Sequence, residues 1–326
     1  MDDDIIADWN GVQRAISFLS ICKPEQRKTL TIGGTMMDIT QSAMQFEAGA
    51  CCQNRCLTGI QPQADLTTLS SLQARMQSIP ANYAAWWMCL LPVAAMKQAG
   101  LPMPFFIKMD DVEYALQIKE QVVMMTGVCV WHENFHLKYA PWNEYYITRN
   151  GCITYALHGQ AKNALAVTLE LWRTVLHLLF LHRYDTAKFV LQGYRDFLRG
   201  WKWLQKTDAI SLHRQILQQQ QAATEQFQTD CTEVPDSIPQ VSFFEATRAA
   251  VQKQKSVFLF HPFTKKGFYA NRKKGTAFQL LLKMGGISLR MLITYRSVVQ
   301  GFQKNRTILC EDAAWNRRNQ HNSEEK

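Results

Sequence analysis

The pattern of hydrophobic residues changes near residue 140, and this change constrains the fold more than any other feature of the 326-residue chain. Before that point, short apolar runs are separated by glycine, proline and other turn residues. After it, apolar residues recur at helical spacing over long segments. Such a change is typical of an α/β unit followed by a helical unit. We therefore predict an α/β domain over residues 1–140 and a helical extension over residues 141–326.

The apolar spacing and the turn residues also predict individual elements. In the first part we expect helices at 9–22, at 92–99 and beginning at 110, strands at 30–39, 44–51, 84–91, 105–108 and 122–131, and a loop at 53–68. In the second part we expect helices at 142–182, 185–205, 208–228, 242–255 and 276–303. No internal repeat is visible in the sequence.

The amino-acid composition indicates what kind of partner the chain can bind and in what state its cysteines are. Hydrophobic residues make up 47% of the chain, which is enough for a sizeable core. The net charge of +9 favours an anionic partner such as a sugar nucleotide, an acidic membrane surface or nucleic acid. The nine cysteines contain no CxxC pair, so buried thiols in a reducing cytoplasm explain them better than a zinc site does. The acidic N-terminus does not resemble a secretory signal, and we expect a cytoplasmic protein.

Two segments bear on contact with the inner face of the plasma membrane. Residues 164–181 are strongly apolar, but Glu170, Arg173 and His177 interrupt them at helical spacing, which favours a buried or interfacial helix over a membrane span. Basic and aromatic residues are interleaved from 258 to 274. This pattern suits peripheral contact with anionic lipid, or nucleic acid, although an ordinary solvated loop is the more common explanation.

Two acidic clusters and one histidine stand out in the first 132 residues. The clusters are Asp2-Asp3-Asp4 and Asp110-Asp111-Val112-Glu113, and the histidine is His132, which follows an apolar run. An Asp-x-Asp pair can bind a hard divalent cation through oxygen, and a later histidine can complete the coordination. An acidic chain end, helix-capping carboxylates and a strand-end histidine would produce the same residues without a site.

These clusters belong to a series of motifs that resembles bacterial galactofuranosyltransferases, which are inverting family 2 glycosyltransferases with a GT-A fold. The motifs, in order, are Asp2-Asp3-Asp4-Ile5, Trp86-Trp87-Met88, Gly100-Leu101-Pro102, the segment 106–114, Val130-Trp131-His132, and Tyr145-Tyr146 with Arg149-Asn150. Each motif alone is weak, whereas the first five in order are specific, and the Tyr145-Tyr146 motif with Arg149-Asn150 follows them as in the family. The resemblance covers about residues 1–150, and it implies the C-terminal part of a GT-A (Rossmann-like) domain followed by an α-helical domain. The strands that bind uracil and ribose in the family would precede residue 1.

The resemblance also implies roles for individual residues. Asp2, Asp4 and His132 would bind Mn²⁺ or Mg²⁺. Asp111 would be the catalytic base, and Asp110 would hydrogen-bond to hydroxyls of the sugar or the acceptor. The residues expected to contact substrate are Trp86, Trp87, Glu113, Tyr145 and Arg149. Paired tryptophans are nevertheless common in protein cores, and helical spacing places Tyr145 and Arg149 on one helix face whatever their function.

The implied reaction is the transfer of galactofuranose from UDP-galactofuranose to a cell-surface glycan on a lipid carrier. Met109 stands where the family commonly carries tryptophan, which keeps a transferase for another sugar, such as rhamnose, as an alternative. A second alternative is an inactive, truncated, basic helical protein that binds anionic lipid or polymer. Nucleic acid is the least favoured partner.

Overall fold

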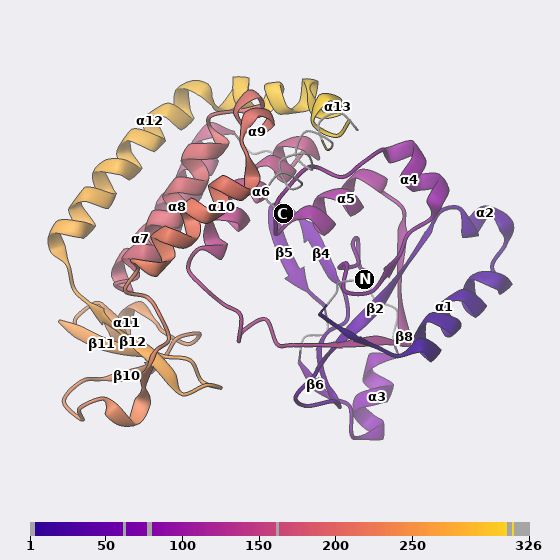
Figure 1. Cartoon of the computed structure of the whole chain (residues 1–326), viewed down its shortest axis with the longest axis horizontal. Helices are drawn as coiled ribbons and strands as arrows, with labels where there is room; N and C mark the ends of the chain where they lie inside the picture. The colour runs from indigo at the N-terminus through magenta and orange to yellow at the C-terminus, as the bar shows by residue number, and fades with distance from the viewer. Residues whose placement is uncertain (1–3, 61–62, 77–79, 161–162, 312–314, 316–326) are drawn as a thin grey trace.

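The computed structural model describes residues 4–60, 63–76, 80–160, 163–311 and 315. These residues form a mixed α/β structure. A six-stranded sheet lies in the first part of the chain, a group of helices follows, and a small four-stranded sheet precedes the long helix α12 (Figure 1). One continuous hydrophobic core joins the two parts, because Ile32 and Val130 of the large sheet belong to the same buried cluster as Leu171 and Phe302 of the helices.

The large sheet has the strand order β1-β8-β2-β3-β6, and β7 also pairs with β2. Its strands are β1 (Ile6–Ala7), β2 (Leu30–Asp38), β3 (Met44–Glu47), β6 (Ala64–Asp65), β7 (Cys89–Leu90) and β8 (Gln121–His132). The central strands β2 and β8 are parallel, with Leu30 opposite Gln121 and Asp38 opposite His132. The carboxyl ends of both strands therefore meet at one edge, which is where open α/β sheets bind their ligands.

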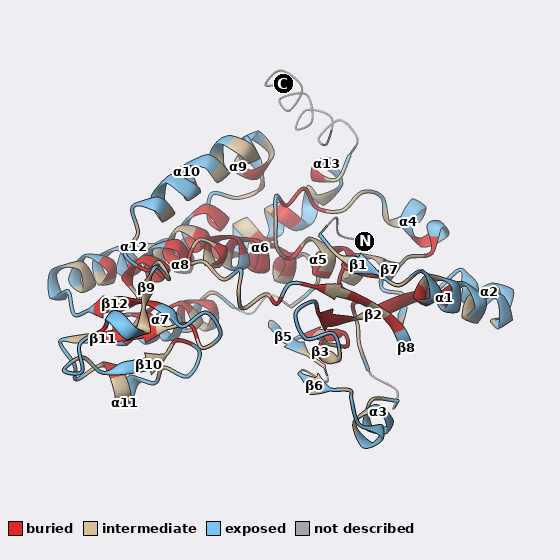
Figure 2. Cartoon of the chain, turned by 60° about the horizontal axis from the view of Figure 1, so that its bottom comes forward, coloured by how far each residue is buried: buried red, intermediate tan, exposed pale blue. Residues whose placement is uncertain are grey.

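Helices and a hairpin surround this sheet. They are α1 (Trp9–Ile21), α2 (Pro24–Arg27), α3 (Leu69–Arg75), α4 (Val93–Ala99), α5 (Asp110–Ile118) and the hairpin β4 (Ala50–Gln53) with β5 (Cys56–Gly59). Helix α1 begins where the Asp8 carboxylate accepts a hydrogen bond from the Asn10 backbone N–H, and it packs on β8. Figure 2 shows β2 buried along its length while α1 and α2 are largely exposed, as expected for a central strand covered by surface helices.

The second part is mainly helical. Its helices are α6 (Asn143–Leu157), α7 (Ala164–Phe180), α8 (Tyr184–Phe197), α9 (Trp201–Lys206), α10 (Ala209–Gln221), α12 (Lys274–Lys304) and α13 (Arg306–Leu309). Helices α6 and α8 pack closely, and α12 contacts α6, α7 and α8. The small sheet contains β9 (Thr229–Asp230), β10 (Gln240–Ser242), β11 (Ser256–Phe260) and β12 (Lys266–Asn271), and the short helix α11 (Arg248–Val251) lies between β10 and β11.

The structure confirms several of the strongly patterned elements. The helices expected at 9–22, 92–99 and from 110 correspond to α1, α4 and α5, and the strands expected at 30–39 and 122–131 correspond to β2 and β8. The helix expected at 276–303 corresponds to α12. The helix expected at 142–182 is instead divided into α6 and α7, the helix expected at 185–205 is divided into α8 and α9, and the helix expected at 208–228 ends at Gln221 as α10.

Other predicted elements are wrong, each for a physical reason. The strand at 44–51 is split into β3 and β4 at Gly49, whose φ of 99° interrupts a strand. Of the strand expected at 84–91 only Cys89–Leu90 forms a strand, β7, after a turn at 86–88, and the loop expected at 53–68 contains β5 and β6. The helix at 242–255 shrinks to α11, and the small sheet was not expected. Short apolar runs such as 256–260 fit a strand or a buried helix equally well by periodicity.

Candidate functional site

Asp4 and His132 meet at the carboxyl edge of β8. Strand β1 pairs antiparallel with β8, with Ile6 opposite Trp131, so Asp4, two residues before β1, lies beside the end of β8. The His132 Nε2 atom is 3.2 Å from the Asp4 Oδ1 atom; the imidazole is buried and the carboxylate is half exposed. The other ring nitrogen, Nδ1, contacts the Glu133 carbonyl oxygen. This contact orients the ring so that Nε2 faces Asp4.

Lys138 completes this group. Its Nζ atom lies 2.6 Å from Asp4 Oδ2. The hydrogen bond from Lys138 lowers the pKa of the Asp4 carboxyl below its ordinary value, and the nearby His132 adds to this effect against the opposing influence of burial. Asp4 is therefore ionised at neutral pH and can act as an oxygen ligand.

The donor chemistry of the pair suits a divalent cation. Carboxylate oxygen and neutral imidazole nitrogen are ligands of Mn²⁺, and a metal-binding histidine commonly donates its second N–H to a backbone carbonyl, as Nδ1 of His132 is placed to do. Two donors are not a full set, and the part of the chain that the structure describes contains no group of three His, Cys, Asp or Glu side chains arranged to hold an ion. Asp2, the third predicted ligand, lies outside the described residues.

Asp38 is a neighbour of His132 that the sequence analysis did not single out. It ends β2 opposite His132 and is buried. Its Oδ1 atom accepts hydrogen bonds from the backbone N–H and the hydroxyl of Thr40, and Oδ2 accepts one from Asn134. Burial acts to raise the pKa of Asp38, but these hydrogen bonds outweigh it and lower the pKa below its ordinary value. Asp38 therefore orders the loop after β2, and its position at the end of a predicted strand is the signal that could have identified it.

Asp110 and Asp111 begin α5, directly after a strained turn. Lys108 and Met109 have φ values of 66° and 70°, in the left-handed region that residues other than glycine rarely adopt. Such strain persists only where the surroundings enforce it, and it is concentrated at functional sites. The strand expected at 105–108 is absent because this turn replaces it. Both carboxylates remain partly exposed, and Asp111 Oδ1 accepts a hydrogen bond from the Val112 backbone N–H at 2.7 Å.

Asn150 of α6 holds this turn in place. Its side chain is fully buried, and its Nδ2 atom donates to the carbonyl oxygens of Ile107 and Lys108, both at 2.9 Å. A buried amide that satisfies two backbone carbonyls offsets the cost of the left-handed residues. Helix α6 therefore fixes the orientation in which Asp110 and Asp111 are presented.

Tyr145 and Arg149, which we expected to contact substrate, lie buried beneath the turn. The Arg149 Nε atom donates to Asn150 Oδ1 at 2.9 Å, and a second guanidinium nitrogen donates to the Tyr145 hydroxyl at 3.1 Å. The Tyr145 hydroxyl in turn donates to Asp196 Oδ2 at 3.1 Å. These contacts orient Asn150, so the two residues support the site from below, and a direct contact with substrate stays a prediction.

Glu113 is also fully buried, although Asp111 lies only two residues before it. Its Oε1 atom is 2.9 Å from His158 Nε2 and 3.4 Å from a guanidinium nitrogen of Arg306. Its Oε2 atom accepts from the Met103 backbone N–H. Glu113 thus connects α5 to α6 and α13, and a contact with substrate would require these pairs to break.

Trp86 and Trp87 diverge because they lie in a turn. Trp87 is buried, and its indole N–H donates to the Gly34 carbonyl oxygen at 3.1 Å. Trp86 is partly buried and packs edge-on against Tyr114. The Trp87 ring is 5.9 Å from Phe135, whose ring is 4.8 Å from His132. Of the two tryptophans, only Trp87 thus connects to the Asp4–His132 pair.

Phe135 also connects this pair to the α5 turn, since Lys108 Nζ lies 5.3 Å from the centre of its ring. The described site residues therefore fall into three groups. Asp4, His132 and Trp87 lie at the carboxyl edge of β8 or are linked to it through Phe135, and the turn that presents Asp110 and Asp111 adjoins Phe135 through Lys108. Glu113, Tyr145 and Arg149 belong to the buried support, and Trp86 packs on Tyr114 of α5.

Glu47, at the end of β3, is a second residue that the sequence analysis missed. Burial raises the pKa of Glu47 to about 7, and the negative charge of Asp111 adds to the shift. The carboxyl group packs so closely on β5 that a Cβ atom at Gly59 would lie 2.6 Å from Glu47 Oε2. The site thus contains a carboxyl group that is largely neutral below pH 7 near Asp111. Glu47 lies inside the strand expected at 44–51, and the sequence carries no signal for this role.

Replacing Glu47 by glutamine is expected to change how stability depends on pH. The pKa of Glu47 in the folded protein, about 7, exceeds its ordinary value of 4.5. Its contribution to stability is therefore fully present below pH 4.5 and is lost as the pH rises through about 7. Glu47→Gln should resemble the wild type near pH ~5 and be more stable by on the order of 2 kcal/mol near pH ~8.5. Urea unfolding at both pH values measures this, with Glu25→Gln on the exposed surface of α2 as the control. If the difference in stability between Glu47→Gln and the wild type is the same at both pH values, the raised pKa of Glu47 is contradicted.

Comparison with known proteins gives a distant similarity. No family model matches the chain. It is similar to galactofuranosyltransferase GlfT2 of Mycolicibacterium smegmatis, with 26% identity over 217 residues, and to galactofuranosyltransferase GlfT2 of Mycobacterium tuberculosis, with 26% identity over 221 residues. Each match covers 61% of this chain but only 33% and 34% of the relatives, so the chain spans about a third of the length of the curated relatives it matches. The similarity indicates a distant relationship to glycosyltransferases.

Proposed function

We propose that this chain forms part of an inverting, metal-dependent glycosyltransferase that transfers galactofuranose from UDP-galactofuranose to a glycan acceptor. The observation that carries the proposal is the pairing of Asp4 with His132 at the carboxyl edge of β8, linked through Phe135 to the turn that presents Asp111. The similarity to two galactofuranosyltransferases supports the choice of sugar. The lipid-carried acceptor is proposed from the sequence resemblance alone.

Asp4 and His132 would hold the cation. A bound Mn²⁺ or Mg²⁺ neutralises the charge that develops on a departing diphosphate. Lys138 keeps Asp4 ionised and places a further positive charge within 2.6 Å of the same carboxylate. Together these residues make the end of β8 suited to an anionic leaving group.

Asp111 would take the proton from the acceptor hydroxyl. An inverting transfer needs one base, on the face of the sugar opposite the leaving group. The N-terminus of α5 and the Val112 N–H stabilise the ionised form of Asp111. Below pH 7 the neutral Glu47 places no second full negative charge near this base. The two carboxyl groups thus have different protonation states because their surroundings differ.

Met109 bears on the alternative of a different sugar. Its side chain is buried in the main core. A difference from the family at this position would therefore act through the shape of the turn rather than through contact with the sugar. Because the residue at this position still differs from the family, a transferase for rhamnose stays the second candidate.

The proposal is tested by calorimetric titration of UDP and UDP-galactofuranose into the full chain, with and without Mn²⁺. We expect metal-dependent binding that weakens at least about tenfold in Asp4→Ala. Asp230→Ala is the matched control, because Asp230 is an exposed carboxylate in the small sheet that binds the Thr232 backbone. A nucleotide-activated rhamnose that binds more tightly would favour the alternative sugar. Binding that is independent of metal and of Asp4 would contradict the proposal. No binding by the folded chain would mean either that donor binding needs residues outside this sequence or that the chain is the basic helical protein of the second alternative.

A further inference from the structure

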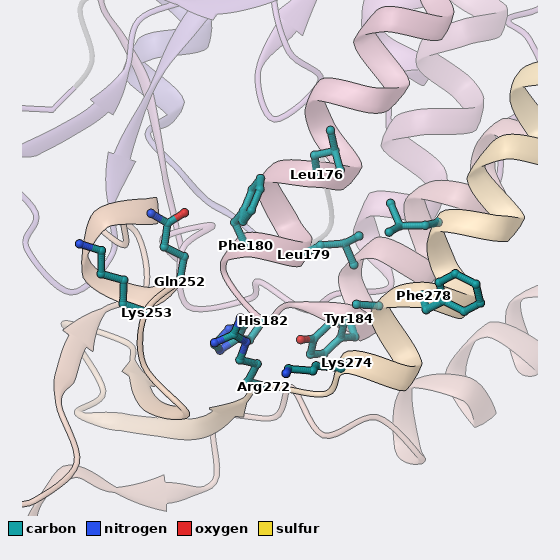
Figure 3. A pocket seen from close by; sticks show the side chains of 12 residues that line it. Leu176, Leu179, Phe180, His182, Tyr184, Gln252, Lys253, Arg272, Lys274 and Phe278 are labelled. Atoms are coloured by element: carbon teal, nitrogen blue, oxygen red, sulfur yellow. The ribbon is translucent and has the colours of Figure 1, made fainter.

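A cavity of about 660 Å³ opens between the C-terminal half of α7, the start of α12 and the end of β12 (Figure 3). This volume lies within the range of sites that bind small molecules. Its apolar wall is formed by Leu176, Leu179 and Phe180 of α7 and by Phe278 and Leu281 of α12. None of its lining residues belongs to the candidate glycosyltransferase site.

One end of the cavity is positively charged. Arg272 and Lys274 line this end, Lys253 lines the cavity on the side of α11, and none of the twelve described lining residues is acidic. Figure 3 shows Arg272 and Lys274 near the junction of β12 and α12, apart from the apolar wall. The junction is fixed to α8, because the Lys273 backbone N–H donates to the Tyr184 hydroxyl oxygen at 3.0 Å. An apolar cavity with one cationic end matches an amphiphile that has an anionic head.

Two exposed apolar stripes extend from the cavity over the surface. On α7 the stripe consists of the exposed Leu165, Leu169, Trp172 and Phe180 with the partly buried Leu176 between them, and on α12 of the exposed Phe278, Leu282, Leu289, Leu292 and Ile293. We call these ten residues the apolar belt. The two stripes adjoin, since the Trp172 indole N–H donates to the Ser288 hydroxyl of α12 at 2.9 Å. Exposed apolar surface of this extent marks an interaction site.

The α12 part of the apolar belt lies on the outer face of that helix, and the inner face of α12 packs against the core. Among the described residues, α12 is the helix long and apolar enough to cross a membrane by length and composition. Its inner face, however, is buried from Leu280 near its start to Phe302 near its end. Leaving the protein to span a bilayer would expose this whole face to lipid and uncover the core. The geometry instead suits a helix that lies in the plane of a membrane surface.

We propose that the cavity binds the phosphate headgroup and the adjoining acyl segment of one anionic phospholipid, while the apolar belt rests on the bilayer that supplies it. Arg272 and Lys274 would pair with the phosphate, and the acyl chain would pass along Phe278 into the bilayer. The net charge of +9 adds a long-range attraction to an anionic surface. The proposal does not rest on glycosyl transfer, because neither the cavity nor the belt contains a residue of that site.

Sedimentation of the full chain with lipid vesicles tests this inference. We expect binding to phosphatidylcholine vesicles that contain phosphatidylglycerol, and little binding to phosphatidylcholine alone. The double variant Arg272→Glu/Lys274→Glu should lower the partition coefficient at least about tenfold. The matched control Lys202→Glu/Lys206→Glu makes the same change of charge on exposed residues of α9, outside the cavity, and should lower it less than about threefold. Phe278→Ser should also weaken binding, because it removes an apolar group shared by the cavity and the belt.

Two further measurements distinguish a lipid headgroup from free phosphate as the bound anion, and a lipid bilayer from a second copy of the chain as the partner that covers the apolar belt. A soluble short-chain phosphatidic acid should compete with vesicles for the wild type, whereas inorganic phosphate at the same concentration should not. Competition by phosphate alone, equal losses in the two double variants, or no vesicle binding would overturn the proposal. A wild type that sediments as a dimer, and becomes monomeric in Phe278→Ser, would show that a second copy covers the belt instead. UDP binding should be unaffected by all these variants, so failure here is distinguishable from failure of the proposed function.

Discussion

The variant Asp111→Asn is expected to reduce the rate of sugar transfer by about 10²–10⁴-fold, because it removes the group proposed to accept the proton of the acceptor hydroxyl. Donor binding should stay close to that of the wild type, since the Asp4–His132 pair is untouched. The side chain is partly exposed, so the substitution should leave the fold intact. Release of UDP under single-turnover conditions measures the effect, and calorimetry measures donor binding.

Asp110→Asn is the matched control for Asp111. It makes the same chemical change at the neighbouring position of α5, where we expect a hydrogen bond to a hydroxyl rather than proton transfer. Its effect on the rate should be about tenfold or less. If both variants lose the same amount of transfer rate, the loss comes from a change in the turn before α5 and not from removal of the base. An active Asp111→Asn variant would exclude Asp111 as the base.

The largest effect on stability is expected from Glu113→Ala, which should lower the free energy of unfolding by about 3–5 kcal/mol. The substitution leaves Arg306 and the nearly buried His158 without their carboxylate partner, and it removes the acceptor for the Met103 N–H. Glu133→Ala is the control, because Glu133 is half exposed and its pairing with Lys138 should contribute less than about 1 kcal/mol. Urea unfolding measures both variants.

The same variant decides between the two interpretations of Glu113. A support role predicts a loss of stability with little selective change in the KM for the acceptor. A variant of normal stability with a strongly raised KM would restore the predicted contact with substrate. The fully buried carboxylate and its three partners favour the support role.

The candidate site shows which of its residues local sequence patterns can predict and which they cannot. The acidic residues at 110–113 form a local pattern at the start of a predicted helix, and His132 follows a long apolar run. Their roles as base and metal ligand were implied by the family resemblance, because helix capping and a strand-end histidine explain the same residues without a site. Tyr145 and Arg149 were correctly placed on one face of a helix, but periodicity alone does not say whether that face meets a ligand or the protein interior. The structure shows that it meets Asn150 and Asp196.

Local patterns in the sequence thus determined the helices α1, α5 and α12, the parallel strands β2 and β8, and the residues with the chemistry to bind a cation or accept a proton. Only the tertiary structure decided that Asp4 reaches His132, that Asn150 holds the turn before Asp111, and that burial against Gly59 keeps the nearby Glu47 neutral below pH 7. The reason is physical. Periodicity and capping act within a few residues of the chain, whereas contact and desolvation depend on segments that only folding brings together.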